Sequence, residues 1–323
     1  MHIACSGPTD SGKSTFVMEH GGGSNSLALK AIADDLAASH GRRACVYDRL
    51  GYGWTPSMYR KGKGEVFPTS GELLKSLLAN AGETGPYTCV GHSAGGHACL
   101  RFALAVGDQV TGIAILDGYP DLISAGAFRP GTAHRTDSSP ALPGTKLFGA
   151  LVGPTGFSRL FIGNAGPDYE PQAQADAFKA LYSQTRFWLS QYSDLAQAVD
   201  EGQDQFTWPL MGGVEDSRGI VTYGGTLNAH VLVLPADTTV YKICTADYEY
   251  NEYCCKDSNK DKDICTNQAE DSGMYLEQAG LYATSIGTSG AMEVAPRGAG
   301  HVYPQLKQYY PWVVERLLSH FPN

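Results

Sequence analysis

The segment Gly91-His92-Ser93-Ala94-Gly95 places a serine inside a G-x-S-x-G pattern, directly after the short apolar run 87–90. Small residues two positions before and two after a serine let the backbone turn sharply from a strand into a helix, and this turn exposes the hydroxyl oxygen. A helix is expected to follow, because residues 98–105 are good helix formers with apolar side chains on one side. We therefore predict that Ser93 is a nucleophile.

A serine nucleophile needs a histidine base and a carboxylate that orients the histidine. His301 is the preferred base, because it follows a predicted strand near the C-terminus and has glycines on its N-terminal side. Asp237 is the preferred carboxylate, because it ends the apolar strand that begins near residue 230. Asp117 ends another predicted strand and is the alternative acid. The sequence thus predicts a triad of Ser93, His301 and Asp237.

A glycine-rich loop lies upstream of the serine. Residues 15–19 are predicted to form a strand that runs into His20-Gly21-Gly22-Gly23. Backbone N–H groups in such a loop stabilise the negatively charged oxygen that forms when a carbonyl is attacked. We predict an oxyanion hole made by the amide of Ala94 together with Gly22 and Gly23.

Predicted strands and helices alternate over the first 120 residues. This alternation indicates a mostly parallel sheet that is covered by helices on both faces. The expected strands are 2–5, 15–19, 44–48, 87–91 and 112–116, followed later by 230–234 and 291–295, and the expected helices are 27–39, 70–81, 94–106 and 305–320.

The pattern changes over 121–225, where glycine, proline and aromatic residues surround helical pieces at 172–182 and 187–199. We interpret 121–225 as a cap inserted into a core formed by 1–120 and 226–323, and 241–290 as a polar, cysteine-containing insert within that core. Aromatic side chains of a cap either hold it together or line a substrate pocket. The candidates for the pocket are Trp188, Tyr192 and Phe206.

In order and approximate spacing, these motifs resemble the α/β-hydrolase superfamily. The resemblance rests on residues 20–26, 47–55, 91–96, 112–117 and 300–301, and it covers nearly the whole chain apart from parts of 125–225 and 241–290. It implies an α/β-hydrolase fold, with a mostly parallel central sheet flanked by helices and an inserted, mainly helical cap. Epoxide hydrolases and haloalkane dehalogenases share this cap-bearing plan but carry aspartate at the position of Ser93, so the serine argues against both activities.

Composition excludes several other classes of protein. The chain has 323 residues, of which 42% are hydrophobic, and is long enough for one large α/β domain with a lid. A formal charge of −9 and the lack of a basic cluster argue against nucleic acid as a partner. No apolar run approaches the roughly 18 residues of a membrane span. We expect a small-molecule substrate and no cofactor or metal, and the oligomeric state stays open.

The eight cysteines fall into two groups. Cys5, Cys45, Cys89 and Cys99 lie in or beside predicted core elements, where free cysteines behave as small apolar residues. Cys244, Cys254, Cys255 and Cys265 lie in the polar insert, with a spacing that suits two disulfides rather than a zinc site. Disulfides form in oxidising compartments. We therefore expect a secreted or lumenal location, with a leader absent from this chain, although no N-x-S/T glycosylation motif supports it.

Two further motifs are better explained as loops. Residues 7–14 match the phosphate-binding pattern G-x-x-x-x-G-K-S/T, but that motif requires a following helix, and a strand is predicted instead. We interpret 7–14 as a polar hairpin turn. Residues 257–263 begin like a calcium loop, but Lys262 and Gln268 occupy its required glycine and glutamate positions, which favours a solvated charged loop.

The sequence therefore predicts a serine hydrolase that cleaves a neutral carboxylic ester through an acyl-enzyme. Amide or aminopeptidase-type hydrolysis, carbon–carbon bond cleavage and perhydrolysis use the same triad, and Asp194, Asp200 or Glu201 would bind the amine of an aminopeptidase substrate. The alternative from another class is a hydrolase-like protein that binds a ligand without turning it over.

Overall fold

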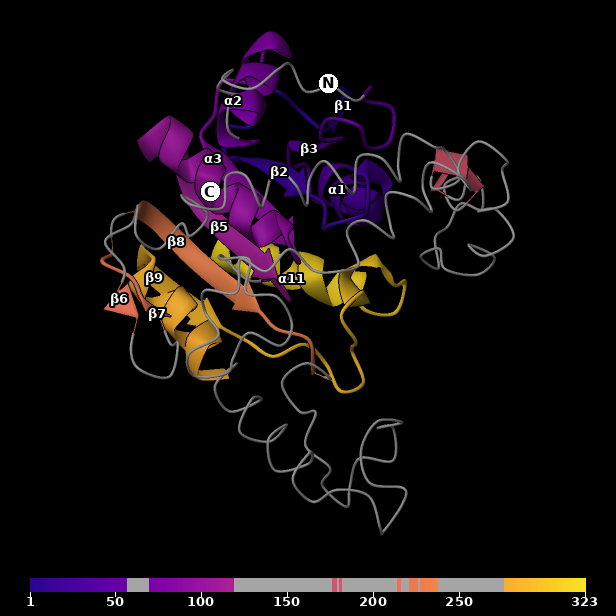
Figure 1. Cartoon of the computed structure of the whole chain (residues 1–323). Coiled ribbons are helices and arrows are strands. Elements are labelled where there is room, and N and C mark those ends of the chain that lie inside the picture. Colours follow the sequence, from indigo (N-terminus) through magenta and orange to yellow (C-terminus); the bar gives the residue numbers. More distant parts are fainter. Residues whose placement is uncertain are drawn as a thin grey trace, which may run out of the picture.

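The computed structural model describes residues 1–56, 70–118, 176–178, 180–181, 214–215, 221–225, 227–237 and 276–323. Within these residues, seven strands form one sheet, in the spatial order β1-β3-β2-β4-β5-β8-β9 (Figure 1). The strands are β1 (Ile3–Ser6), β2 (Thr15–Glu19), β3 (Ala44–Tyr47), β4 (Tyr87–His92), β5 (Val110–Leu116), β8 (Leu227–Leu234) and β9 (Gly287–Met292). A separate short pair joins β6 (Val214–Glu215) to β7 (Val221–Thr222).

The sheet is parallel except at one edge. β1 runs antiparallel to β3, and every other neighbouring pair is parallel. β2 and β4 are buried at every position, as expected for strands that helices cover on both faces. The carboxyl ends of β2, β4, β5 and β8 consequently lie along the same edge of the sheet.

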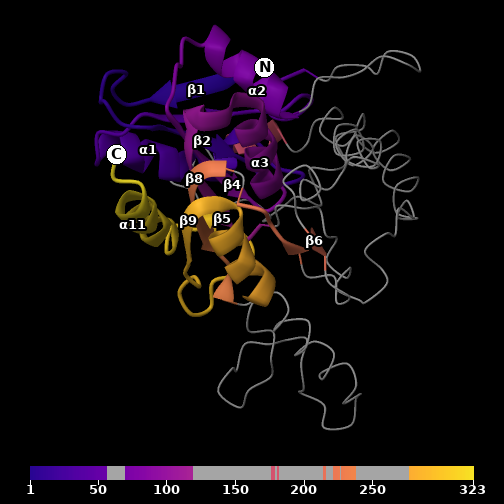
Figure 2. The same ribbon diagram turned by 90° about the vertical axis from the view of Figure 1, so that its left-hand side faces the viewer.

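Helices cover both faces of the sheet, and each face has its own apolar core. The core on one face contains side chains of α2 (Ser70–Asn80), α3 (Gly95–Val106) and a helix over 276–285, and the core on the other contains side chains of α1 (Lys30–Ala38) and α11 (Tyr310–His320). Figure 2 shows the sheet between these two layers. Short 3-10 turns occur at η1 (Ser26–Leu29), η2 (Gly107–Gln109) and η5 (Tyr303–Gln305). None of the helices among the described residues is long and apolar enough to cross a membrane.

The predicted fold class is confirmed, and most predicted elements lie within a few residues of the observed ones. The exception is the polar insert: residues 276–285 form a helix whose Ala279, Tyr282 and Ala283 are buried in the core, so the core resumes before residue 290. The apolar residues of this helix come directly after a polar stretch, so their helical spacing was not recognised in the sequence. Residues 176–178, 180 and 181 are helical, as predicted, and Phe178 and Leu181 pack on Leu27 and Ala28.

The phosphate-loop-like segment 7–14 leads directly into β2 and not into a helix. This outcome agrees with the interpretation against a nucleotide site. The segment is not a hairpin turn, however, because β3 lies between β1 and β2 in the sheet.

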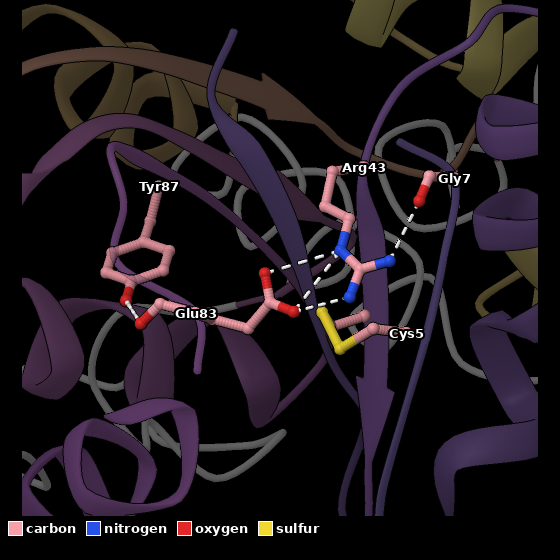
Figure 3. Close-up of a disulfide and its surroundings, with 6 residues drawn as sticks. Cys5, Gly7, Arg43, Glu83 and Tyr87 are labelled. Carbon is pink, nitrogen blue, oxygen red and sulfur yellow. Dashed lines mark hydrogen bonds and ion pairs between the residues drawn. A yellow bond between two sulfur atoms is a disulfide. The ribbon is translucent and has the colours of Figure 1, made fainter. Parts of the chain in front are cut away.

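The core cysteines are paired, contrary to the expectation that they are free. Cys5 joins Cys45 across β1 and β3, and Cys89 on β4 joins Cys99 on α3. Figure 3 shows the first pair beside the Arg43 guanidinium, which donates to the Glu83 carboxylate and to the Gly7 carbonyl. Sequence reasoning missed both pairs because the partners come together only when the strands and the helix pack. The insert cysteines 244, 254, 255 and 265 lie outside the described residues.

Candidate active site

Ser93 lies on a sharp turn between β4 and α3. Its backbone has a φ of 54°, in the left-handed region, and its N–H donates to the carbonyl of Leu116 on β5 at 3.0 Å. A side chain at Gly91 would lie 2.3 Å from the carbonyl oxygen of Gly95, and one at Gly95 would lie 2.4 Å from that of Glu19. The two glycines of the G-x-S-x-G pattern are therefore required by close backbone contacts, and they let the turn present the serine side chain at the sheet edge.

His301 bridges this serine and a carboxylate. Its Nε2 lies 3.0 Å from Ser93 Oγ, and its Nδ1 lies 2.6 Å from Asp117 Oδ2. Because a carboxylate accepts hydrogen bonds, Nδ1 carries the proton and Nε2 is free to accept the proton of the serine hydroxyl. The His301 side chain is half exposed, whereas that of Asp117 is buried.

The carboxylate beside His301 is thus that of Asp117, and the sequence preference for Asp237 is corrected. Asp117 follows β5, the neighbour of the serine strand, whereas Asp237 follows β8, one strand further away. The other oxygen of Asp117 accepts the amide of Ala236 at 2.8 Å, which fixes the carboxylate. Asp237 is buried and accepts the amide of Gly298 at 2.8 Å, so it holds the loop that leads to His301.

The backbone conformation of Asp117 is unusual, and the sequence alone does not reveal it. Its φ is 42°, and aspartate is among the few residues besides glycine that adopt this region readily. A side chain at the next residue, Gly118, would lie 2.4 Å from the carbonyl oxygen of Ser93. The strand end at Asp117 is therefore folded directly against the serine turn.

The glycine loop lies against the same turn. A side chain at Gly21 would lie 3.3 Å from Cβ of Ser93, and one at Gly22 would lie 3.7 Å from Cβ of Ala94. Gly23 has a φ of 64°, which glycine adopts without strain. Ala94 is the residue before the first turn of α3, where backbone N–H groups lack partners within the helix. The structure thus places the glycine loop, through Gly21 and Gly22, against Ser93 and Ala94.

Two buried histidines flank the site and remain neutral. His92 donates from Nε2 to the carbonyl of His301 at 2.8 Å, and burial, reinforced by the nearby His301, lowers its pKa to about 4. Burial lowers the pKa of His20 well below its ordinary value, and the positive charge of Arg49 acts in the same direction. Tyr303 donates its hydroxyl to the carbonyl of Leu234, and burial raises its pKa well above the usual value, with Asp117 adding to the effect. These groups shape the site without exchanging protons near neutral pH.

Several predicted residues lie outside the described part of the chain. They are the pocket candidates Trp188, Tyr192 and Phe206, the acidic candidates Asp194, Asp200 and Glu201, and the calcium-like loop 257–263. One group of potential metal ligands meets among the described residues, namely Cys5, Cys45 and Glu83. Its two sulfur atoms are bonded to each other, and metal binding requires them as thiolates.

Comparison with known proteins identifies the family. Residues 16–315 match the profile of the Alpha/beta hydrolase family, and the chain belongs to that family. A comparison with curated proteins found no significant match.

Solved structures of low sequence identity share the fold. A thermophilic esterase from Thermogutta terrifontis is 16% identical, with a TM-score of 0.57 over 98% of this chain and 91% of that one. A probable hydrolytic enzyme from Pseudomonas aeruginosa PAO1 is 14% identical, with a TM-score of 0.59 over 98% and 88%. A mutant of a putative epoxide hydrolase from Pseudomonas aeruginosa is 19% identical, with a TM-score of 0.59 over 98% and 90%. At these identities the likeness establishes the fold and not the substrate.

Proposed function

We propose that this hydrolase cleaves neutral carboxylic esters, with Ser93 as nucleophile, His301 as base and Asp117 as the orienting acid. The observation that carries the proposal is the continuous chain of contacts from Ser93 Oγ to His301 Nε2, at 3.0 Å, and from His301 Nδ1 to Asp117, at 2.6 Å. A nucleophile, its base and the group that orients the base are the parts that serine acyl transfer needs.

In the first half of the reaction, His301 Nε2 takes the proton of Ser93 as the serine oxygen attacks the ester carbonyl. Asp117 holds the imidazole in the tautomer that has Nε2 unprotonated and stabilises the imidazolium that forms. The imidazolium then protonates the leaving alcohol, which leaves an acyl group on Ser93. In the second half, His301 activates a water molecule in the same way, and the acid is released.

The negative oxygen of the tetrahedral intermediate would be held by backbone N–H groups. Ala94 follows Ser93 and Gly22 lies against Ala94, which supports these two residues as donors, with Gly23 as the next residue of the loop. Loss of one such donor typically costs about a hundredfold or more in turnover.

Hydrolysis of p-nitrophenyl esters of increasing acyl length tests the proposal. The native chain should hydrolyse at least one ester of the series, and Ser93→Ala and His301→Ala should each lose at least about a thousandfold in kcat. The chain-length optimum would give the size of the acyl pocket. A native chain that leaves every ester intact while a fluorophosphonate still labels Ser93 would exclude the ester substrate and favour amides or carbon–carbon substrates. No labelling of Ser93 would favour a ligand-binding protein.

The two cysteine pairs of the core support an oxidising compartment for this hydrolase. Cys5–Cys45 and Cys89–Cys99 are disulfides in the folded chain, and such bonds persist mainly outside the reducing cytosol. Peptide mapping of the protein isolated from its own cells, after alkylation of free thiols, should find both pairs joined. Alkylated Cys5 and Cys89 would contradict this location.

A further inference from the structure

Arg49, which follows β3, reaches back to the glycine loop beside Ser93. Its Nη1 donates to the carbonyl of His20 at 2.6 Å, and its Nη2 donates to the carbonyl of Gly21 at 2.9 Å. Nη1 also forms an ion pair with the carboxylate of Glu19, which is fully buried at the end of β2. One guanidinium group therefore binds three consecutive residues of the segment that enters the loop.

The contact with Gly21 determines where an N–H group points. The carbonyl of Gly21 and the amide of Gly22 belong to one peptide unit, and the only cis bond among the described residues is Gly85–Pro86. In a trans peptide the C=O and N–H bonds point in opposite directions. Because Arg49 holds the Gly21 oxygen on its own side, the Gly22 N–H is turned to the opposite side of the loop. Gly22 is the residue whose added side chain would contact Ala94 of the serine turn.

A second donor reinforces this orientation. His20 Nδ1 lies 2.9 Å from the same Gly21 oxygen, and the amide of Arg49 donates to His20 Nε2 at 3.4 Å. His20 therefore carries its proton on Nδ1, which agrees with the lowered pKa that keeps this buried ring neutral. Tyr52 packs edge-on against the His20 ring, and its own ring lies beneath the Arg49 guanidinium. Both donors to the Gly21 oxygen are thus fixed by packing.

We propose that Arg49 is a positioning residue that, with Glu19 and His20, locks the Gly21–Gly22 peptide so that the Gly22 N–H faces the oxyanion formed on Ser93. This inference rests on the proposed function, because the oxyanion exists only if Ser93 attacks a carbonyl. The guanidinium also neutralises the fully buried Glu19 carboxylate, whose charge would be costly if it were unpaired.

The rate at which a fluorophosphonate labels Ser93 tests the inference, because the attack creates a negative oxygen at phosphorus that the same donors stabilise. Arg49→Lys keeps the charge opposite Glu19 but lacks the planar fork that binds two carbonyls. The double variant Glu19→Gln/Arg49→Ala removes both charges of the ion pair together. Arg42→Lys is the matched control, because Arg42 is buried and donates to the main-chain carbonyls of Phe321 and Asn323, in a different part of the fold.

The labelling rate constant and kcat should fall about tenfold in Arg49→Lys and further in the double variant, up to the roughly hundredfold effect of losing an oxyanion donor. KM should stay within about threefold, because the contact forms mainly in the transition state. Arg42→Lys should label at the native rate. Methylguanidine should restore part of the rate in the double variant.

Native labelling rates in both Arg49 variants would overturn the inference and leave the proposed function intact. The inference would also be overturned if Arg42→Lys slowed labelling as much as Arg49→Lys at an equal fall in melting temperature, because the effect would then come from stability alone. A native chain whose Ser93 is not labelled would instead refute the proposed function, and with it the role of Arg49.

Discussion

The two halves of the candidate site are built in different ways. The serine turn and the glycine loop are fixed by backbone contacts: a side chain at Gly91 or Gly95 would lie within 2.4 Å of a carbonyl oxygen, and Ser93 itself has a φ of 54°. The histidine and its acid are brought together by side-chain hydrogen bonds between residues 184 positions apart, and His301 remains half exposed.

This difference shows which part of such a site restricts the residue type at each position and which part can take its residue from more than one strand. A turn that depends on backbone contacts admits only small residues at set positions, so it leaves a short motif in the sequence. A carboxylate needs only to reach the histidine ring from any neighbouring strand end. In this chain two buried aspartates follow adjacent strands. Asp117 contacts the His301 ring, and Asp237 accepts the Gly298 amide in the loop that leads to His301.

The different roles of Asp117 and Asp237 are tested most strongly by making the same substitution at both positions. Asp117→Asn should lower kcat by about 10⁴-fold, because an amide no longer fixes the required imidazole tautomer. Asp237→Asn should lower it by less than about tenfold, because its amide oxygen still accepts the Gly298 N–H. Ester hydrolysis at saturating substrate measures both. The reverse order of effects would restore Asp237 as the acid partner.

The backbone-determined half is tested by adding a methyl group at Gly95. In Gly95→Ala the new carbon would lie 2.4 Å from the Glu19 oxygen and 2.9 Å from that of His20, so the loop and the serine turn must separate. We expect a loss of about 100-fold in kcat/KM from misplacement and of about 3 kcal/mol in unfolding free energy from overpacking.

Gly280→Ala is the control for this change, because an added side chain there meets no atom within 4 Å. It should stabilise the helix over 276–285 by about 0.5–1 kcal/mol and leave kcat unchanged. Urea unfolding followed by circular dichroism measures both variants. Equal stabilities for the two variants would show that the serine turn tolerates a side chain at Gly95.

The supporting role of Asp237 predicts a loss of stability rather than of chemistry. Asp237→Ala leaves the Gly298 amide without its acceptor, which should cost about 1–3 kcal/mol in unfolding free energy. The remaining folded enzyme should keep its pH profile, since Asp117 still contacts His301. A changed pH profile of kcat would mean that Asp237 also influences the titration of the histidine.

The last prediction concerns the dependence of stability on pH. His92 has a pKa of about 4 when folded and an ordinary value near 6.5 when unfolded, so the unfolded chain binds more protons between these values. Stability therefore falls as pH is lowered through this window. Between pH 7 and pH 5 the contribution of His92 should be roughly 1–2 kcal/mol. Urea midpoints should drop less over this range in His92→Gln than in the native chain, and the lowered pKa of His20 should contribute a fall in the same direction in both. Equal drops would show that His92 is not held neutral.

Much of the fold was predictable, because parallel strands buried on both faces appear as short apolar runs between helical stretches. The boundaries that failed have physical causes. The helix over 276–285 carries glutamate, glutamine and glycine beside its buried Tyr282, so its period was not visible within a polar stretch. The disulfide partners Cys89 and Cys99 lie on a strand and on the helix packed over it, and only packing brings their sulfur atoms together.

The sequence by itself predicted Ser93 as the nucleophile, His301 as the base and the glycine loop beside them, because these features depend on local backbone geometry that restricts residue types at fixed spacing. Only the tertiary structure shows which of Asp117 and Asp237 contacts His301. Both end apolar strands and look alike in sequence, but the strand order places β5 beside the serine strand and β8 beyond it. The choice of acid depends on distance across the sheet, and that distance follows from how the strands are ordered.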